Sequence, residues 1–243
     1  MNGVRSGRAI RTAAWGVHAY TALGLPLALA QVAALVEGDG QRFFLLNAAA
    51  VFVDATDGVL ARAVKVKQVL PQFDGRKLDD IIDFLTFAFL PALAVVALGL
   101  VPPALAAIVC VPVMASGYGF CQDAAKTEDS FVGFPSYWNI VVFYLWVLAA
   151  RPGVVIATAL VLSVLVFVPI HYVYPTRASL LKPLTITLGY LWGATIAVLA
   201  ALPREPWSHV VALASLAYPA YYTLLSAVHH RRVAGRADPG GLE

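Results

Sequence analysis

Hydrophobic stretches of about twenty residues recur along the whole length of this 243-residue chain, separated by short turns that contain Gly, Pro or charged residues. A helix needs a stretch of that length to cross the hydrocarbon core of a bilayer. Apolar residues make up 60% of the chain and charged residues only 13%, with a mean hydropathy of +0.77. The pattern therefore predicts an all-α integral membrane protein.

The boundaries of these stretches predict a polytopic bundle of about eight transmembrane helices. The fifth is the weakest, because it offers only fourteen apolar-rich residues, and we expect it to tilt, to extend into its flanks or to lie partly at the interface. We expect one membrane-embedded domain over residues 1–243, with short cytoplasmic tails at 1–12 and 231–243. The predicted spans are 13–36, 42–61, 79–100, 102–122, 137–150, 153–173, 184–202 and 207–229.

The distribution of basic residues indicates how the bundle sits in the membrane. An even number of spans places both termini on one side. If that side is the cytoplasm, only Arg42, Arg151 and Arg204 of the 17 Lys and Arg residues lie outside. Basic loops stay on the cytoplasmic side, so we expect both termini there. The net charge of +3 is spread over several loops, which indicates attraction to anionic membrane lipid and no nucleic-acid partner.

Segment 54–83 departs from the apolar pattern, because it holds six of the fourteen acidic residues. Asp54 and Asp57 are three positions apart and share one face of the second predicted span. Asp79 and Asp83 are four apart and share one face of the third. The connection between the two spans is short enough to set these faces against each other. The spacing therefore predicts four converging carboxylates toward one surface of the membrane.

Four such carboxylates cannot all stay ionised near a membrane without cations, because each raises the pKa of the others. An all-oxygen donor set selects Mg²⁺ or Mn²⁺, and two ions sharing bridging carboxylates suit displacement at phosphorus. Arg62 adds the fixed positive charge that a diphosphate requires. The small residues Gly58, Ala61 and Gly75 stand beside the acids and let a substrate approach the backbone.

Other interpretations of the acidic segment remain open at this point. The aspartates could be solvated loop charges or helix caps, and for Asp74 and Asp80, which break the helical spacing, that interpretation is favoured. A cation-coupled transporter is the alternative from a different class, because intramembrane Asp residues are typical of ion pathways. Such a protein usually has its carboxylates near the bilayer midplane, whereas these cluster toward one surface.

The pattern Asp54-x2-Asp57-Gly58-x2-Ala61-Arg62, twelve residues, then Gly75-x3-Asp79-x3-Asp83 resembles the signature of the CDP-alcohol phosphotransferase family. Most of that family has a shorter spacer after the arginine. The longer spacer resembles the branch that makes phosphatidylcholine in bacteria. The stretches HAYTALG at 18–24, GFPSYWN at 133–139 and VPIHYVYPTR at 168–177 resemble that branch too.

This resemblance implies a bundle around six core helices in the bacterial inner membrane, with the active site on the cytoplasmic side and a homodimeric assembly. It implies that choline attacks CDP-diacylglycerol to give phosphatidylcholine and CMP. Asp83, Asp79 and Arg62 would be catalytic, with Asp83 as general base. The implied metal ligands are Asp54, Asp57, Asp79 and Asp83, and the implied contacts to the CDP moiety are Gly58, Ala61, Arg62, Gly75 and Thr21.

The acceptor is the alcohol that attacks CDP-diacylglycerol, and the aromatic residues of the chain bear on its identity. A quaternary ammonium such as choline is recognised by aromatic faces and nearby negative charge. Tyr137 and Trp138 in GFPSYWN are the favoured contacts, although such rings also anchor proteins at membrane interfaces. Arg177 is assigned to the lipid phosphate or to an interfacial anchor. Serine or a phosphorylated alcohol is the alternative acceptor. The rings considered are Tyr118, Tyr137, Trp138, Tyr172 and Tyr174.

Overall fold

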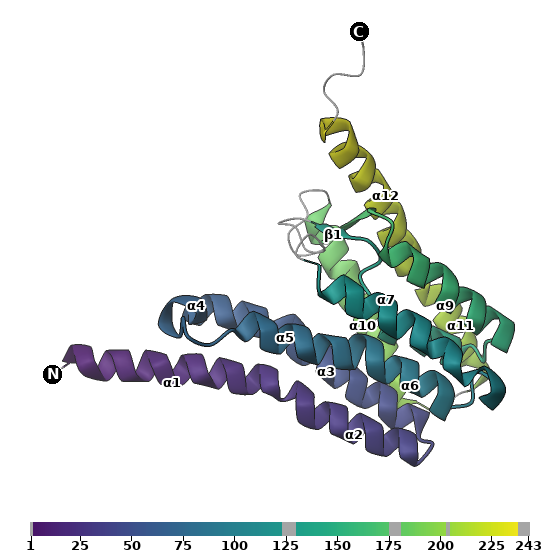
Figure 1. Cartoon of the computed structure of the whole chain (residues 1–243), viewed down its shortest axis with the longest axis horizontal. Coiled ribbons are helices and arrows are strands. Elements are labelled where there is room, and N and C mark those ends of the chain that lie inside the picture. The colour runs from purple at the N-terminus through teal and green to yellow at the C-terminus, as the bar shows by residue number, and fades with distance from the viewer. Residues whose placement is uncertain (1, 123–129, 175–180, 203–204, 238–243) are drawn as a thin grey trace, which may run out of the picture.

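The computed structural model describes residues 2–122, 130–174, 181–202 and 205–237, without the side chains of residues 2–6 and 236–237. Within these ranges the regular elements are helices, apart from two short strands (Figure 1). The all-α class predicted from hydropathy is therefore confirmed, with one small sheet added.

The first half of the chain forms a row of helices. In Figure 1, α1, α3 and α5 run together toward the N-terminal end of the molecule, and α2 and α6 continue toward the opposite end. α1 contacts both α3 and α5, so the second and third predicted spans pack against the same helix. The elements are α1 (Asn2–Ala22), α2 (Gly24–Val36), α3 (Gly40–Val64), α4 (Val66–Val69), α5 (Gly75–Asp83), the π-helix η1 (Phe84–Phe89) and α6 (Leu90–Ala97).

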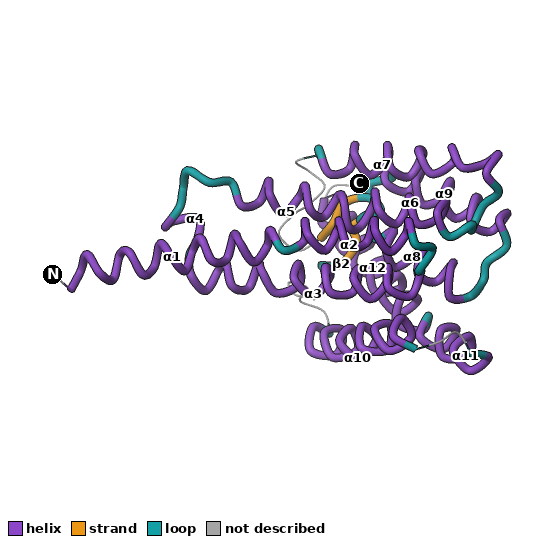
Figure 2. The backbone as a smooth tube through the Cα atoms, turned by 90° about the horizontal axis from the view of Figure 1, so that it is seen from below, coloured by secondary structure: helices purple, strands orange, loops and turns teal. Residues whose placement is uncertain are grey.

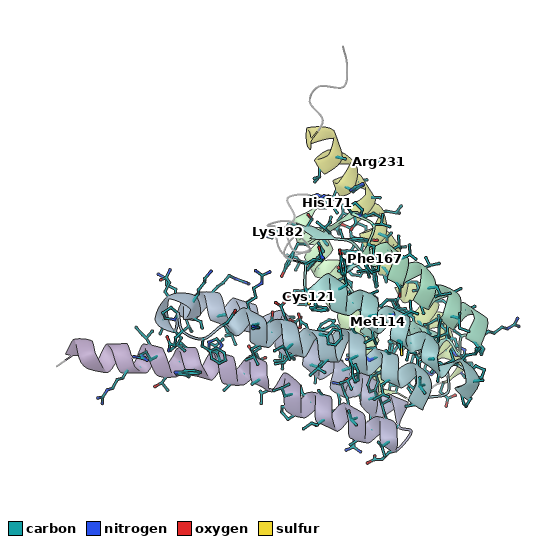
Figure 3. The ribbon with its side chains drawn as sticks, in the orientation of Figure 1. Met114, Cys121, Phe167, His171, Lys182 and Arg231 are labelled. Atoms are coloured by element: carbon teal, nitrogen blue, oxygen red, sulfur yellow. The ribbon has the colours of Figure 1, made fainter. Side chains whose placement is uncertain are left out.

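The second half adds further helices and the sheet. Figure 2 shows both strands, in orange, beside α12 near the middle of the molecule. Figure 3 shows that Cys121, Phe167, His171 and Lys182 gather near the sheet, so α7 and α9 end, and α10 begins, on this side. The elements are the 3₁₀ helix η2 (Pro103–Val109), α7 (Cys110–Phe120), β1 (Ser130–Val132), α8 (Trp138–Val147), α9 (Pro152–Val166), β2 (His171–Val173), α10 (Lys182–Ala201), α11 (Pro206–Ser215) and α12 (Ala217–Ala237).

Six helices in the described ranges are long and apolar enough to cross a membrane. Two shorter apolar helices, α8 and α9, fall where the fifth and sixth spans are predicted. At ten residues, α8 is too short to cross upright, which agrees with the weak fifth stretch. A polytopic membrane protein is thus confirmed. The six long segments are Gly7–Val36, Gly40–Val64, Gly75–Ala97, Pro103–Phe120, Lys182–Ala201 and Pro206–Gly235.

The predicted span 153–173 is wrong at its C-terminal end. α9 ends at Val166, and His171–Val173 form β2, which pairs antiparallel with β1 so that Phe131 lies opposite Tyr172. Pro169 interrupts the helical pattern, because proline lacks an N–H and disfavours helical geometry in the preceding residue. The chain therefore leaves α9 before Pro169 and continues as β2, which pairs with β1.

Aromatic rings fill the space between α3 and α8. Phe43, Phe44, Phe143 and Trp146 are each less than a tenth exposed. The ring centroid of Phe44 lies 5.2 Å from that of Phe143 and 4.9 Å from that of Trp146. Gly40 lies so close to the indole that a Cβ there would be 2.7 Å from Nε1 of Trp146. This core fixes the start of α3, more than two turns before its first aspartate.

A buried polar cluster joins α2, α3 and η1. Asn47 Nδ2 donates to Gln31 Oε1 at 3.2 Å and to the carbonyl oxygen of Thr86 at 2.9 Å. Pro91 provides no N–H for the carbonyl of Phe87 and its ring crowds that group, which favours the wider turns of η1 just before it. The hydrogen bond from Asn47 to the Thr86 carbonyl therefore joins η1 to α3.

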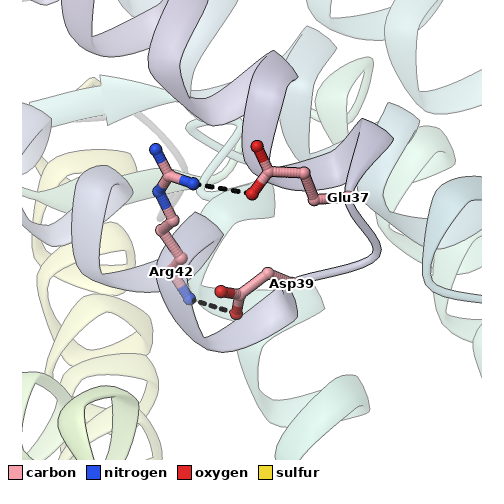
Figure 4. A network of polar contacts seen from close by, with 3 residues as sticks. All are labelled: Glu37, Asp39 and Arg42. Carbon is pink, nitrogen blue, oxygen red and sulfur yellow. Dashed lines mark hydrogen bonds and ion pairs between the residues drawn. The ribbon is translucent and has the colours of Figure 1, made fainter.

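Side-chain contacts hold the turn between α2 and α3, and they allow a stability test (Figure 4). Asp39 Oδ1 accepts a hydrogen bond from Arg42 N at 2.9 Å, and Arg42 Nη1 pairs with Glu37 Oε2 at 2.6 Å. Asp39→Ala should lower the free energy of unfolding by about 1 kcal/mol, because it removes the cap of α3. Glu37→Gln should lower it by less than about 0.5 kcal/mol, since both partners of that pair are half exposed. Thermal unfolding in detergent micelles measures both values, and an equal loss would contradict the capping role.

Candidate active site

Aspartates from α3 and α5 converge in the bundle. One carboxylate oxygen from each of Asp54, Asp57 and Asp79 lies within 4.8 Å of the others, and the same holds for Asp79, Asp80 and Asp83. Asp79 belongs to both groups, so the two groups form one acidic site. The convergence predicted from helical spacing is therefore confirmed for Asp54, Asp57 and Asp79, and Asp83 joins them through its cluster with Asp79. An all-oxygen donor set of this size fits a hard divalent cation such as Mg²⁺ or Mn²⁺.

The two acids that break the helical spacing have different positions. Asp74 caps α5, because its Oδ1 accepts a hydrogen bond from Lys77 N at 3.1 Å, which confirms its interpretation as a helix cap. For Asp80 the interpretation as a loop charge or cap is wrong. It lies inside α5, in one cluster with Asp79, and its Oδ2 is 3.9 Å from Arg76 Nε. Neighbouring helical residues project about 100° apart, so the acidic site spans two adjacent faces of α5.

Asp57 is the most enclosed member of the acidic site, with 7% of its surface exposed. Its Oδ2 accepts a hydrogen bond from Thr21 Oγ1 at 2.7 Å, which joins α3 to α1. The carboxylate also accepts a hydrogen bond from the backbone N–H of Gly58 and is attracted by the positive charge of the Arg62 guanidinium. A buried carboxylate needs such partners. Thr21 and Arg62, both predicted to contact CDP, are thus positioned at the site through Asp57.

The small residues of the motif serve close packing in the structure. A Cβ on Gly75 would lie 2.5 Å from Cε1 of His18, so α5 begins directly against that ring. A Cβ on Gly58 would lie 3.3 Å from Arg62 Nη1. Ala61 packs against an apolar cluster shared by α1 and α4. Their contact with a nucleotide stays a prediction.

A cavity of about 240 Å³ lies beside the acidic site. Its acidic wall is formed by side chains from α3 and α5, while Asp57 lies outside its lining. Its other wall is aromatic and comes from η1, α7, the sheet and the segment before α8. The cavity therefore combines negative charge with ring faces. The acidic lining is Asp54, Asp79, Asp80 and Asp83, and the aromatic lining is Phe87, Phe120, Phe131, Phe134, Tyr137 and Tyr174.

The residues predicted to contact the acceptor have separate positions. Tyr137 lines the cavity. Its ring stands edge-on to that of Tyr222, with centroids 6.5 Å apart. Trp138 is buried between helices, and its Nε1 donates to Ser116 Oγ at 2.7 Å. Arg177 lies outside the described residues.

Two aromatic cavity residues come from the sheet that hydropathy did not predict. Phe131 lies on β1, and Tyr174 directly follows β2. Tyr174 is among the rings considered from the sequence, whereas Phe131 is missed. The available signal is weak: two three-residue strands beside Gly133 and Pro169 are too short to be separated from apolar helix ends by periodicity.

Comparison with known proteins adds an independent observation. No family model matches the chain. It is 41% identical to the phosphatidylcholine synthase of Pseudomonas aeruginosa over 181 residues, 74% of this chain and 76% of that protein. It is 38% identical to the phosphatidylcholine synthase of Legionella pneumophila over 228 residues, 88% and 87% of the two chains. The corresponding protein of Bradyrhizobium diazoefficiens is 38% identical over 189 residues, 76% and 70%.

Proposed function

The chain belongs to the phosphatidylcholine synthase family, and we propose that its acidic site joins choline to the phosphatidyl group of CDP-diacylglycerol. This is the chemistry of a CDP-alcohol phosphotransferase. The observation that carries the proposal is the meeting of α3 and α5 aspartates beside an aromatic cavity. Membership in a family of synthases decides against the cation-coupled transporter.

Asp83 acts as the general base. It removes the proton from the choline hydroxyl as the oxygen bonds to the phosphorus that carries diacylglycerol. The bond between that phosphorus and the oxygen bridging to the CMP phosphate breaks, and CMP leaves. Arg62 stabilises the negative charge of the diphosphate. Thr21, Gly58, Ala61 and Gly75 contact the CDP moiety.

Asp54, Asp57, Asp79 and Asp83 would hold divalent metal, two ions of Mg²⁺ or Mn²⁺. Their carboxylate oxygens are the ligands that such hard ions prefer, and those of Asp54, Asp57 and Asp79 lie within 4.8 Å of one another. When bound, the ions neutralise the diphosphate and the departing phosphate. Asp79, which belongs to both acidic clusters, would hold the two parts of the metal site together.

The proposal extends to the membrane setting. We place the single domain, residues 1–243, in the bacterial inner membrane as a homodimer, with both termini and the active site on the cytoplasmic side. The acyl chains then stay in the bilayer while the headgroup reaches the acids. Arg177 binds the lipid phosphate or anchors the interface. Tyr137 contacts choline, whereas the hydrogen bond from Trp138 to Ser116 supports a packing role for that ring.

Release of CMP by purified protein tests the proposal. The protein receives CDP-diacylglycerol, Mn²⁺ and, in separate reactions, choline, serine, inositol phosphate and glycerol phosphate. We expect CMP release with choline and little with the other alcohols. Phosphatidylcholine should form in the same amount as CMP. Release with serine alone, or with a phosphorylated alcohol alone, would overturn the choline assignment.

A further inference from the structure

The small sheet is attached to α12 along the edge of β2 that β1 leaves open. Val173 N donates to Ser226 Oγ at 3.1 Å, and Tyr222 Oη donates to the Val173 carbonyl at 2.9 Å. His171 N donates to His230 Nδ1 at 3.3 Å. Tyr222, Ser226 and His230 are spaced four residues apart and share one face of α12. They meet the backbone groups that a third strand would pair.

The sheet presents aromatic rings to the acidic site. Phe131 and Tyr174 stack, with ring centroids 4.8 Å apart and an interplanar angle of 18°. Tyr137 stands edge-on to Phe131, with centroids 6.3 Å apart. Tyr137 and Asp54 both line the cavity. All three rings line the same cavity as the carboxylates of Asp54, Asp79, Asp80 and Asp83.

This lining suits a cation that has no N–H to donate. A quaternary ammonium cannot be bound through hydrogen bonds from nitrogen, so ring faces and negative charge are its natural partners. Among the described lining residues the one basic side chain is Arg76, and it lies 3.9 Å from Asp80. The cavity thus favours a cationic acceptor over an anionic one.

We infer that the β1–β2 sheet is the acceptor-binding element, in which Phe131, Tyr137 and Tyr174 hold the trimethylammonium group of choline beside the carboxylates. The inference rests on the proposed function and names the part of the chain that selects its acceptor. Tyr222 and Ser226 are positioning residues, because both hold β2 against α12 and Tyr222 also stands edge-on to Tyr137, with ring centroids 6.5 Å apart. The C-terminal helix thereby sets the distance between the rings and the acids.

Substitution of the rings tests the binding element directly. Phe131→Leu and Tyr174→Leu should each raise the KM for choline on the order of tenfold, with kcat changed by less than about twofold, because one cation–π partner is lost. Tyr174→Phe keeps the ring and should raise the KM by less than Tyr174→Leu does. Phe167→Leu is the matched control, since the Phe167 ring packs against Tyr118 with centroids 4.8 Å apart and lies outside the cavity lining. Binding of CDP-diacylglycerol, measured for every variant, checks that the donor site is intact.

An uncharged analogue separates charge from size. The tert-butyl analogue of choline, in which carbon replaces the nitrogen, has the same shape without the charge. The intact protein should prefer choline over this alcohol, and Phe131→Leu and Tyr174→Leu should reduce that preference on the order of tenfold. An unchanged preference in both variants would overturn the inference.

Variants on α12 test the positioning role. Ser226→Ala and Tyr222→Phe remove the two hydroxyl groups that bond to Val173, and each should raise the KM for choline several-fold while CDP-diacylglycerol binding stays unchanged. Thr223→Val is the control, because Thr223 is exposed and its hydroxyl donates to the carbonyl of Pro219 within its own helix. An unchanged KM in both α12 variants would overturn the positioning role. Failure of the intact protein to use choline would instead overturn the proposed function.

Discussion

Asp83→Asn should lower the rate of choline-dependent CMP release by about a thousandfold, while binding of CDP-diacylglycerol stays within a few-fold of the intact protein. Asp83 lies at the end of α5 and lines the cavity together with other aspartates and the aromatic rings. An amide still offers an oxygen to a metal ion, but it cannot take a proton from an alcohol. The substitution therefore separates proton transfer from substrate binding.

Asp74→Asn is the matched control for that measurement. It makes the same chemical change in the same helix, and asparagine caps a helix about as well as aspartate. Asp74 lies outside the cavity lining, so its variant should keep full turnover. Asp80→Asn discriminates between the two neighbouring acids of the cluster. Undiminished turnover in Asp83→Asn together with loss in Asp80→Asn would assign the base to Asp80.

The acidic site could be predicted from the sequence because it depends on local geometry. Residues three and four apart share a helical face, and Asp54 and Asp57 on α3 follow that rule, as do Asp79 and Asp83 on α5. Their short connection leaves few ways to arrange the two faces. Hydropathy likewise predicted the helices, because the bilayer imposes the length of each span.

The aromatic wall could not be predicted in the same way. Phe131 and Tyr174 are separated by more than forty residues and meet only because β1 and β2 pair. A strand of three residues is too short to show the alternation of apolar and polar residues. An apolar strand that follows a helix also resembles a continuation of that helix. Trp138 shows the same limit: its place beside Tyr137 in the sequence says nothing of the Ser116 hydroxyl that its indole reaches.

Long-range contacts also explain why α12 was not recognised as part of the site. The sequence shows the helical spacing of Tyr222, Ser226 and His230. Their partners, however, are backbone groups of β2, and the sequence does not predict that strand. A tyrosine, a serine and a histidine on one face of an apolar helix are polar groups that need partners in a membrane. That need was a usable signal for a contact, although it could not identify β2 as the partner.

Asp79→Ala should reduce choline-dependent CMP release by about a thousandfold, because this residue belongs to both acidic clusters. Loss of a metal that stabilises the diphosphate removes several kcal/mol of transition-state stabilisation, and each 1.4 kcal/mol corresponds to about a tenfold change in rate. Chelation of divalent metal in the intact protein should cause a comparable loss, and addition of Mn²⁺ or Mg²⁺ should reverse it. In the variant, excess metal should not restore the rate.

Measurement of bound Mn²⁺ by electron paramagnetic resonance gives a readout that does not depend on turnover. The intact protein should bind the ion, Asp79→Ala should bind it far more weakly, and Asp74→Asn should bind it as the intact protein does, because that carboxylate caps a helix outside the clusters. Full activity after exhaustive chelation would contradict the metal role. Normal Mn²⁺ binding by an inactive Asp79→Ala would instead show that the carboxylate acts on the substrate and not as a shared ligand.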